Sequence, residues 1–254
     1  MSKIRFTEPN REILARRDSI INDLTRLVDP AGLITSTDEC RAYETDALTA
    51  YRKMPLAVVL PKTTEEVSAV LKYCHDTGVK VVPRGAGTSL AGGAIPSEDA
   101  VVLGLSKMNR VLAVNYDDRF IRVEAGVTNL SVTAVVAENG FFYAPDPSSQ
   151  LACTIGGNIA NNSGGAHCLK YGVTTNNLLG VRMVLIDGSI IDLGGDYLDS
   201  AGLDLLGLVV GSEGQLGIVT EATLRILKSA EGARPVLFGF PSCEGAGKAV
   251  ADVI

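Results

Sequence analysis

Apolar positions repeat at helical spacing near the start of the chain. In "EILARRDSIINDLTRLVDP", residues 12–30, they recur every three or four residues until Asp29 and Pro30 break the pattern. Such spacing gathers the apolar side chains on one face of a helix. We therefore predict an amphipathic helix that packs through Ile20, Leu24, Leu27 and Val28.

Residues 55–82 predict a strand–helix–strand unit, because the spacing of their apolar residues changes from a strand pattern to a helix pattern and back. The run "PLAVVLP" is short and apolar throughout, which is typical of a buried strand. The next residues carry a Thr63-x-x-Glu66 capping box and a closing Gly78, with apolar positions at helical spacing between them. "VKVV" then returns to a strand pattern. We expect a right-handed β-α-β unit with a parallel strand pair.

Strand and helix patterns continue in irregular order after this unit. Residues 100–126 hold short apolar runs separated by turn residues, and residues 128–140 show a helix pattern that ends at Asn139-Gly140. Asp187-Gly188 joins the two runs of "LLGVRMVLIDGSIIDLGG", which is a strong hairpin signal. This mixture predicts an α+β fold rather than a doubly wound parallel sheet.

The C-terminal residues predict one more helix. A strand-like run, "RPVLFGF", precedes a turn at Pro241-Ser242 and a helix pattern through Ala246, Val250 and Val253. The pattern reaches the last residue without a C-cap, which leaves an apolar stripe with nothing to pack against. We therefore expect the 254 residues to be the N-terminal half of a protein roughly twice as long.

Composition and charge exclude several classes of protein. A chain of 254 residues with 46% apolar content can bury a real core. The net charge of −6 provides no basic surface for nucleic acid. No apolar run reaches the roughly 18 residues that a membrane span needs, and the N-terminus is too polar for a signal peptide. We expect a small-molecule partner, no nucleic acid and no direct membrane span.

The cysteines argue against a disulfide framework and against a metal site in this chain. The five cysteines are scattered, and no two of them form a C-x-x-C pair. An odd, scattered set favours a reducing compartment and provides no ligand set for an iron–sulfur cluster. We therefore predict a cytoplasmic protein without metal ligands of its own.

Glycine is concentrated in "PRGAGTSLAGG", residues 83–93, directly after the strand pattern "VKVV". Bare backbone at such a point lets consecutive N–H groups form a nest that holds an anion, although a surface loop has a similar composition. A dinucleotide fingerprint is excluded because Leu90 stands where its third glycine belongs, and no lysine completes a P-loop. The remaining interpretation is a phosphate cradle built by a loop alone.

Two further segments are equally dense in glycine and small polar residues. They are "APDPSSQLACTIGGNIANNSGG", residues 144–165, and "GSEGQLGIVTEATLRIL", residues 211–227. The first of them is too long for an ordinary connector. Three such segments in one apolar-rich chain favour a large, flat, anionic ligand that lies between backbone loops.

Three stretches, in this order and separation, resemble the FAD-binding domain of the vanillyl-alcohol oxidase/p-cresol methylhydroxylase (PCMH) superfamily: "VVPRGAGTSLAGG", "APDPSSQLACTIGGNIANNSGGAHCLKYG" and "DLLGLVVGSEGQLGIVTEATLRIL". Within it they are most similar to the FAD-linked subunit of glycolate oxidase and to D-lactate and D-2-hydroxyglutarate dehydrogenases. The likeness runs from about Thr37 to the C-terminus. It implies a helical segment at 1–50, a two-lobed PCMH-type FAD-binding domain at 51–230 and the start of a substrate (cap) domain at 231–254.

The resemblance also implies which residues bind FAD. The first segment would hold the pyrophosphate through Arg84, Gly85, Ala86, Gly87, Thr88, Ser89, Gly92 and Gly93. The second would line the flavin side through Pro147, Ser149, Cys153, Thr154, Gly156, Gly157, Asn158, Ala160 and Asn161. The third would meet the adenosine end through Glu213, Gly214, Ile218 and Val219. No catalytic residue is assigned here, because the family carries its catalytic and metal-binding histidines in the substrate domain.

One departure from the family bears on how the cofactor is attached. Members that bind flavin covalently through the first segment carry a histidine near the position of Thr88, so this chain is expected to bind FAD non-covalently. His167 follows the flavin segment, and we interpret it as structural. His75 lies on a predicted helix, where we expect a rim or solvent position. Cys153 is interpreted as a small packing residue rather than a nucleophile.

The implied activity is oxidation of a small 2-hydroxyacid, glycolate or D-lactate, with hydride transfer to flavin N5. Implied partners are a second flavin subunit and an iron–sulfur subunit, through which the protein would lie peripherally at the inner membrane. Two alternatives stay open. One is a module that holds flavin without turnover, and the other is a reductase on the same fold whose flavin is reduced by NADPH.

Overall fold

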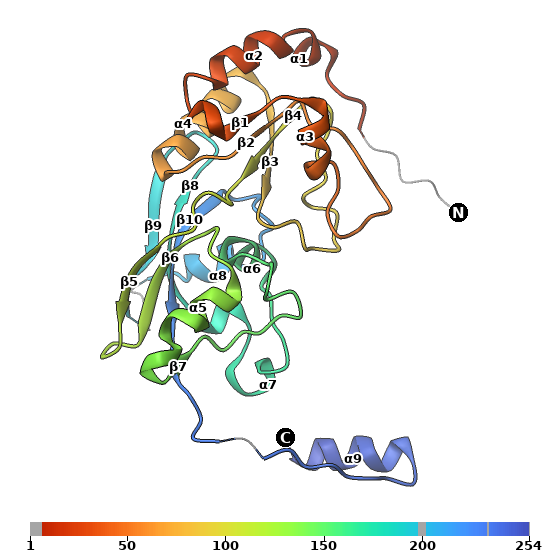
Figure 1. The fold of residues 1–254 in the computed structure, drawn as a ribbon, viewed down its shortest axis with the longest axis vertical. Helices are drawn as coiled ribbons and strands as arrows, with labels where there is room; N and C mark the ends of the chain where they lie inside the picture. The colour runs from red at the N-terminus through yellow and green to blue at the C-terminus, as the bar shows by residue number, and fades with distance from the viewer. Residues whose placement is uncertain (1–6, 198–201, 233, 254) are drawn as a thin grey trace.

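The chain folds into two lobes (Figure 1). A cavity lies between them. This computed structural model describes residues 7–197, 202–232 and 234–253. The first lobe holds a four-stranded sheet, and the second holds a five-stranded sheet and a short two-stranded one. The mixture of helices with parallel and antiparallel strands confirms the α+β class. The outermost residues of the predicted terminal segments, 1–6 and 254, lie outside the described residues, as does 233.

The N-terminal pattern forms two short helices rather than the single predicted one. α1 spans Arg11–Ala15 and α2 spans Arg17–Leu24, because Arg16 leaves helical geometry at φ −95° and ψ 8°. Ile20 and Leu24 are fully buried, as the spacing predicts. The first lobe continues with the 3₁₀ turn Pro30–Gly32, β1 (Leu33–Ile34), α3 (Thr37–Cys40) and the 3₁₀ turn Arg41–Tyr43.

The predicted strand–helix–strand unit is present as β2 (Ala57–Val59), α4 (Thr64–Thr77) and β3 (Lys80–Arg84). The Gly78 stop is confirmed at φ +72°, and the Thr63 hydroxyl accepts a hydrogen bond from the Glu66 N–H at 3.2 Å. The predicted capping box forms only in this half, because the Glu66 carboxylate accepts the Lys62 N–H at 2.6 Å. Local sequence signals therefore set both ends of this helix.

The two strands of this unit are parallel, but they do not form the predicted pair. β4, Ala100–Gly104, lies between them in the sheet order β1-β2-β4-β3. β2 and β3 each pair with β4 in parallel register. Every position of β4 is buried, and only the centre of a sheet covers both faces of a strand that has no polar side.

Asp99, next to β4, is a buried carboxylate that ties the first lobe together. It accepts hydrogen bonds from the Asn10 N–H at 2.9 Å and the Ser97 hydroxyl at 2.7 Å, and Lys80 Nζ lies 2.8 Å away. Burial alone would raise the pKa of Asp99, but these donors outweigh it and hold the pKa at about 2. The charged form is therefore the one that the fold stabilises.

This carboxylate makes stability depend on acid pH. Because the pKa of Asp99 is lowered from the usual value of about 4, its contribution is complete above pH 4 and is lost as the pH falls towards 2. We expect Asp99→Asn to be less stable than the wild type at pH 7, with a smaller further loss between pH 4 and pH 2. Urea unfolding at each pH measures this, and identical pH profiles for the two proteins would contradict it.

The second lobe is built on an antiparallel sheet in the order β5-β6-β10-β8-β9. Gly188, at φ +86°, turns the chain between β8 and β9 and confirms the predicted hairpin. The strands are β5 (Val111–Asn115), β6 (Phe120–Glu124), β8 (Leu178–Val184), β9 (Ile190–Gly194) and β10 (Ile218–Arg225). The short pair is β7 (Phe141–Phe142) and β11 (Leu227–Lys228).

Helices cover the side of this sheet that faces the core of the second lobe. Val132 and Val136 of the predicted helix pack in one cluster with Ile155, Ile159 and sheet residues. The last two belong to a helix inside the second glycine-rich segment, which the sequence predicts only as a loop. The helical elements are α5 (Asn129–Val136), the 3₁₀ turn Ala137–Asn139, α6 (Ile155–Asn161), α7 (Cys168–Tyr171), the 3₁₀ turn Thr174–Asn177 and α8 (Leu205–Val209).

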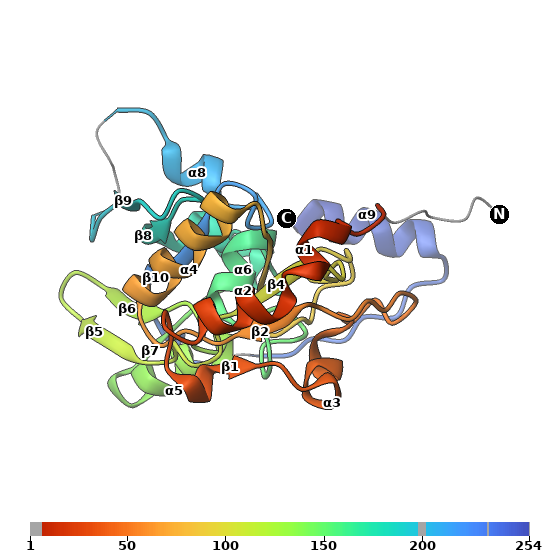
Figure 2. The ribbon, with the colours of Figure 1, turned by 90° about the horizontal axis from the view of Figure 1, so that it is seen from above.

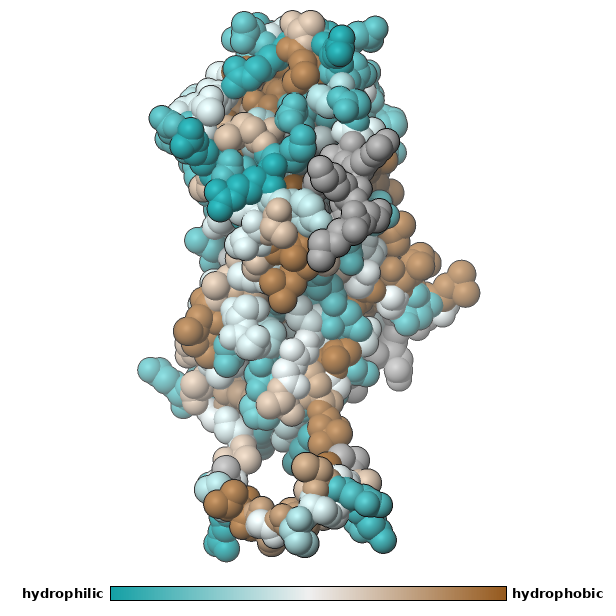
Figure 3. Space-filling model, turned by 90° about the vertical axis from the view of Figure 1, so that its right-hand side faces the viewer, coloured by the Kyte–Doolittle hydropathy of each residue, from teal (hydrophilic) through white to brown (hydrophobic). Residues whose placement is uncertain are grey.

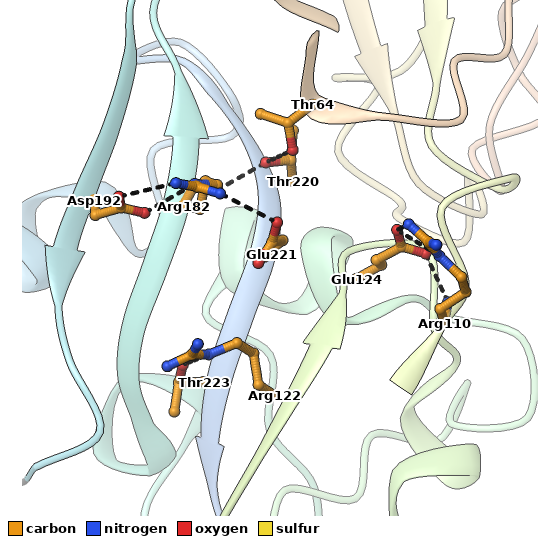
Figure 4. A network of polar contacts seen from close by, with 9 residues as sticks. All are labelled: Thr64, Arg110, Arg122, Glu124, Arg182, Asp192, Thr220, Glu221 and Thr223. Carbon is orange, nitrogen blue, oxygen red and sulfur yellow. Dashed lines mark hydrogen bonds and ion pairs between the residues drawn. The ribbon is translucent and has the colours of Figure 1, made fainter. Parts of the chain in front are cut away.

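α4 of the first lobe docks on the second lobe and fixes the two against each other. Seen from above, this helix lies over β8 and β10 (Figure 2). The Thr64 hydroxyl donates to the Thr220 hydroxyl at 3.0 Å, and Thr220 in turn donates to the Arg182 carbonyl at 3.2 Å (Figure 4). The Ser68 hydroxyl donates to the Gly188 carbonyl at 2.6 Å. These contacts join the first lobe to the second through side chains of α4.

Ion pairs between neighbouring strands favour one register of the five-stranded sheet (Figure 4). Arg182 on β8 pairs with Asp192 on β9 at 3.1 Å and with Glu221 on β10 at 3.7 Å. Arg110 donates from Nε and Nη2 to one carboxylate oxygen of the buried Glu124, at 3.1 and 2.8 Å. Opposite charges on neighbouring strands stabilise one pairing over its slipped alternatives.

The C-terminal segment stands apart from both lobes (Figures 1 and 3). α9, Cys243–Val253, forms where the sequence predicts a helix, and none of its described residues is buried. The run at 234–240 forms no strand, contrary to its apolar pattern, and Leu237 is 97% exposed. A strand requires a partner edge for its backbone groups, and among the described residues none of the three sheets includes this run. Within the described ranges, no helix is both long enough and apolar enough to cross a membrane.

Candidate cofactor-binding site

The cavity between the lobes has a volume of about 350 Å³ and brings the three glycine-rich segments together. The first segment lines it from the first lobe, and the other two line it from the second lobe. The sequence-predicted residues at its wall are Arg84, Gly85, Ala86, Gly87, Thr88, Ser89, Gly93, Ser149, Cys153, Thr154, Gly156, Gly157, Asn158, Ala160, Asn161, Glu213, Gly214, Ile218 and Val219. Gly92 and Pro147 do not line it.

The first segment leaves the end of β3 as a tight loop. Gly87 has φ +72°, a backbone conformation that favours glycine. Within the part of the chain that the structure describes, no protein acceptor receives the backbone N–H groups of residues 85–89. These consecutive donors border the cavity, which is the arrangement that binds a phosphate.

The second segment meets the first directly. A Cβ at Gly85 would lie 2.5 Å from the Thr154 hydroxyl, so only glycine permits this approach of the two segments. Thr154 is also the N-cap of α6, where its hydroxyl accepts the Gly157 N–H at 3.4 Å. α6 exists because this cap and the buried Ile155 and Ile159 outweigh the low helix propensity of two glycines.

The third segment closes the far side of the cavity. Glu213 has φ +53° and donates its N–H to the Ala160 carbonyl at 2.8 Å, which ties this segment to α6. A Cβ at Gly214 would lie 2.7 Å from Cγ of Pro83, which belongs to β3 and begins the first segment. The third segment therefore also contacts the first. The three segments therefore form one continuous wall.

Sequence reasoning missed part of the cavity lining. Ser212 and Gly217 lie within the third segment, where the same glycine pattern could have indicated them. Leu105 and Val209 reach the cavity from the ends of β4 and α8, which no local pattern predicts. The other lining residues not assigned from the sequence are Pro83, Leu90, Ala94, Ile159 and Ser163.

Residues 55–194 match a family described as the FAD binding domain. The chain belongs to this family. The match covers more than half of the chain and includes the first two cavity segments, while the third follows it in sequence. FAD is therefore the cofactor against which the cavity is compared.

Proteins similar over most of this chain carry related names. The glycolate oxidase subunit GlcD of Escherichia coli is 48% identical over 94% of this chain and 48% of that protein. A D-lactate dehydrogenase of Archaeoglobus fulgidus is 38% identical over 92% of this chain and 52% of that protein. A solved alkyldihydroxyacetonephosphate synthase, 23% identical, matches 90% of this chain and 43% of its own with a TM-score of 0.77, which shows the fold. The chain spans about half the length of the curated relatives it matches.

The residues present fit FAD. The unpaired N–H groups of residues 85–89 suit the two phosphates of its pyrophosphate. Asn158 is 1% exposed, and its Nδ2 is a buried donor without a partner in the described structure. A buried unpaired donor is costly unless a ligand accepts its hydrogen bond. Both observations indicate a ligand rich in acceptors.

Arg84, at the start of the first segment, adds a positive charge to the cavity wall. It is 9% exposed, its Nη1 donates to the Thr45 carbonyl at 2.7 Å, and its guanidinium lies 5.5 Å from the Tyr43 ring centre. Burial lowers the pKa of Arg84, and the nearby Tyr43 and Asp46 act in the opposite direction. The guanidinium stays charged, since the pKa of arginine is far above neutrality.

His167 and Cys153 occupy different surroundings. His167 Nδ1 lies 3.2 Å from Asp146, and its ring packs edge-on against Phe142 and Tyr171 outside the cavity lining. Cys153 lines the cavity, is 4% exposed and carries a free thiol. The histidine therefore contributes to the packing of α7, and the cysteine contributes a small side chain to the wall.

Proposed function

We propose that the cavity holds FAD along the three segments in order. Its pyrophosphate would bind at the first segment, its flavin along the second and its adenosine beside the third. The free N–H groups of residues 85–89 support the first placement, and the buried Nδ2 of Asn158 supports the second. Glu213 supports the third placement, since it lines the cavity and its carboxylate would accept hydrogen bonds from ribose hydroxyls.

We propose further that the protein is the FAD-binding part of a flavin-dependent dehydrogenase of 2-hydroxyacids, with glycolate or D-lactate as substrate. The observation that carries this is the 48% identity, over 94% of the chain, to a glycolate oxidase subunit. The similar D-lactate dehydrogenase supports the same substrate class. Because the similar protein is named a subunit, we also propose partners, namely a second flavin subunit and an iron–sulfur subunit.

The side chains of the second segment would position the reacting ring. FAD supplies the acceptor for a hydride from the α-carbon of the 2-hydroxyacid. The Asn158 amide and the Thr154 hydroxyl would donate hydrogen bonds to the pyrimidine edge of the flavin, where reduction increases negative charge. Their burial, at 1% and 5% exposure, fixes both donors before the cofactor arrives.

The choice of substrate is tested by reduction of bound flavin in the complete protein under anaerobic conditions. We expect glycolate or D-lactate to bleach the absorbance near 450 nm, and NADPH to leave it unchanged. Bleaching by NADPH alone would favour a reductase on this fold. No bleaching by any of the three would favour a module that holds flavin without turnover.

We predict that FAD is bound non-covalently. Thr88 stands in the first segment where covalent members carry histidine, and His167 does not line the cavity. Acid precipitation of the flavin-loaded protein should release all of the yellow colour into the supernatant. Flavin that stays with the pellet after washing would show a covalent bond, and digestion with peptide mapping would locate it.

A further inference from the structure

A segment outside the family match supports the phosphate loop from behind. We define the bracing segment as residues 43–48, which precede the matched range 55–194. The Ala47 N–H donates to the Gly87 carbonyl at 2.9 Å, and Arg84 Nη1 donates to the Thr45 carbonyl at 2.7 Å. Each contact joins the bracing segment to a residue proposed to hold the pyrophosphate, Gly87 in the first and Arg84 in the second.

Asp46 is the centre of this segment. Its side chain is 4% exposed, and its two oxygens each accept one backbone hydrogen bond. Oδ1 accepts the Leu48 N–H at 2.9 Å within the segment, and Oδ2 accepts the Gly92 N–H at 2.9 Å across 46 residues of sequence. A carboxylate that accepts two fixed N–H groups sets the distance between the two pieces of backbone.

The contact with Gly92 determines which N–H groups of the loop remain available. Gly92 has φ +78°, and its N–H points to Asp46 rather than to the cavity, which it does not line. Residues 85–89 keep their N–H groups without a protein acceptor within the described chain. The bracing segment thus holds the loop at Gly92 and, through Ala47, at the Gly87 carbonyl, while the N–H groups of residues 85–89 stay available to the cavity.

The charges in this region are consistent with a supporting role. A carboxylate facing a pyrophosphate would repel it, but both Asp46 oxygens accept N–H groups of the protein. The buried Arg84 guanidinium lies between the bracing segment and the loop, where it contacts Thr45 and Tyr43. It offsets the negative charge of Asp46 from the cavity side.

We propose that Asp46 is a positioning residue for the FAD pyrophosphate. It holds the first segment in its binding conformation before the cofactor arrives, and it does so without touching the cofactor. Preorganisation of this kind raises affinity because binding no longer has to order the loop. The inference rests on the proposed function, since it takes FAD as the ligand.

The test compares Asp46→Asn with the matched exposed variant Asp38→Asn, whose carboxylate has 89% exposure. Asparagine can still accept one N–H, but its amide group then opposes the second donor. We expect Asp46→Asn to raise the Kd for FAD at least about tenfold, as the loss of one buried hydrogen bond implies. In the FAD-free protein, hydrogen exchange should become faster at the amides of Leu48, Gly92 or both, whose N–H groups Asp46 accepts, and stay unchanged in α4. Asp38→Asn should leave both quantities unaltered.

Asp46→Glu serves as a second variant that keeps the charge. We expect it to fold and to show a smaller increase in Kd, with exchange again altered only at the Leu48 and Gly92 amides. An unchanged Kd, or unchanged exchange at both of these amides in Asp46→Asn, would overturn the inference. Faster exchange throughout both variants would also overturn it, since Asp46 would then be needed for folding in general. If the wild-type protein itself fails to bind FAD, the proposed function fails, and the exchange measurement still decides whether Asp46 orders the loop.

Discussion

Gly87→Val is expected to abolish FAD binding. Gly87 has φ +72°, where a β-branched side chain is strongly disfavoured, and its Cβ would collide with the Arg84 guanidinium. The loop must then change its course, which displaces the N–H groups proposed to hold the pyrophosphate. We expect the Kd for FAD to rise at least about 100-fold, equivalent to roughly 3 kcal/mol. Flavin fluorescence titration of the apoprotein measures it.

Gly78→Val is the matched control for this variant. Gly78 has the same φ of +72°, so its backbone strain is comparable, but a Cβ there meets nothing within 4 Å. It ends α4 away from the cavity lining. We expect some loss of stability with FAD affinity retained. Equal flavin content in the two variants would show that the first segment is not the phosphate cradle.

Gly126→Ala is expected to destabilise the fold more than any exposed substitution. Its new Cβ would collide with the Leu105 carbonyl oxygen and lie 2.6 Å from that of Met108. Both are backbone atoms, and Gly126 itself donates its N–H to the Met108 carbonyl at 2.8 Å, so the chain cannot move aside easily. We expect a loss of about 3 kcal/mol in the free energy of unfolding, the upper range for overpacking.

Urea unfolding followed by circular dichroism measures this loss. A decrease of this size corresponds to a fall of roughly 6–12 °C in Tm for a chain of this length. Gly247→Ala on α9 is the control, because a Cβ there meets nothing within 4 Å and the helix packs on neither lobe. An equal free energy of unfolding for Gly126→Ala and Gly247→Ala would contradict the close packing of Gly126 against the Leu105 and Met108 carbonyls.

The elements that the sequence predicts correctly are those whose signals lie within a few residues. α4 has its Thr63 cap and its Gly78 stop, and the β8–β9 hairpin has its Asp187-Gly188 turn. The order of strands in a sheet, in contrast, has no signal within a few residues. The position of β4 between β2 and β3 depends on burial of both its faces, which involves residues far away in the sequence.

Glycine content misled the prediction of one helix. α6 lies in a segment predicted as a loop, because the burial of Ile155 and Ile159 is a tertiary effect. Gly32 lies outside the three glycine-rich segments, yet it is buried, and a Cβ there would lie 2.6 Å from the Leu60 carbonyl oxygen. Close backbone packing requires glycine at this position, and no local pattern predicts it.

The convergence of the three segments on one cavity agrees with the pattern of glycines, and the roles of single residues within it are less predictable. Asp46 carries no motif that marks it, and its contact with Gly92 joins positions 46 residues apart. Likewise, sequence alone places Gly92 beside the pyrophosphate, although its N–H is directed to Asp46. Side-chain anchors of a loop become visible only once the chain is folded.

The central claim is that this cavity binds FAD through a cradle for its pyrophosphate. The most direct measurement is titration of the flavin-free chain with FAD, followed by competition for the same site by ADP and by adenosine, which differ only in the pyrophosphate. We expect saturable binding of one FAD per chain and an affinity for adenosine at least about 100-fold weaker than for ADP, as the loss of several charge-assisted hydrogen bonds implies. Equal affinity for both, or no binding of FAD, would contradict it.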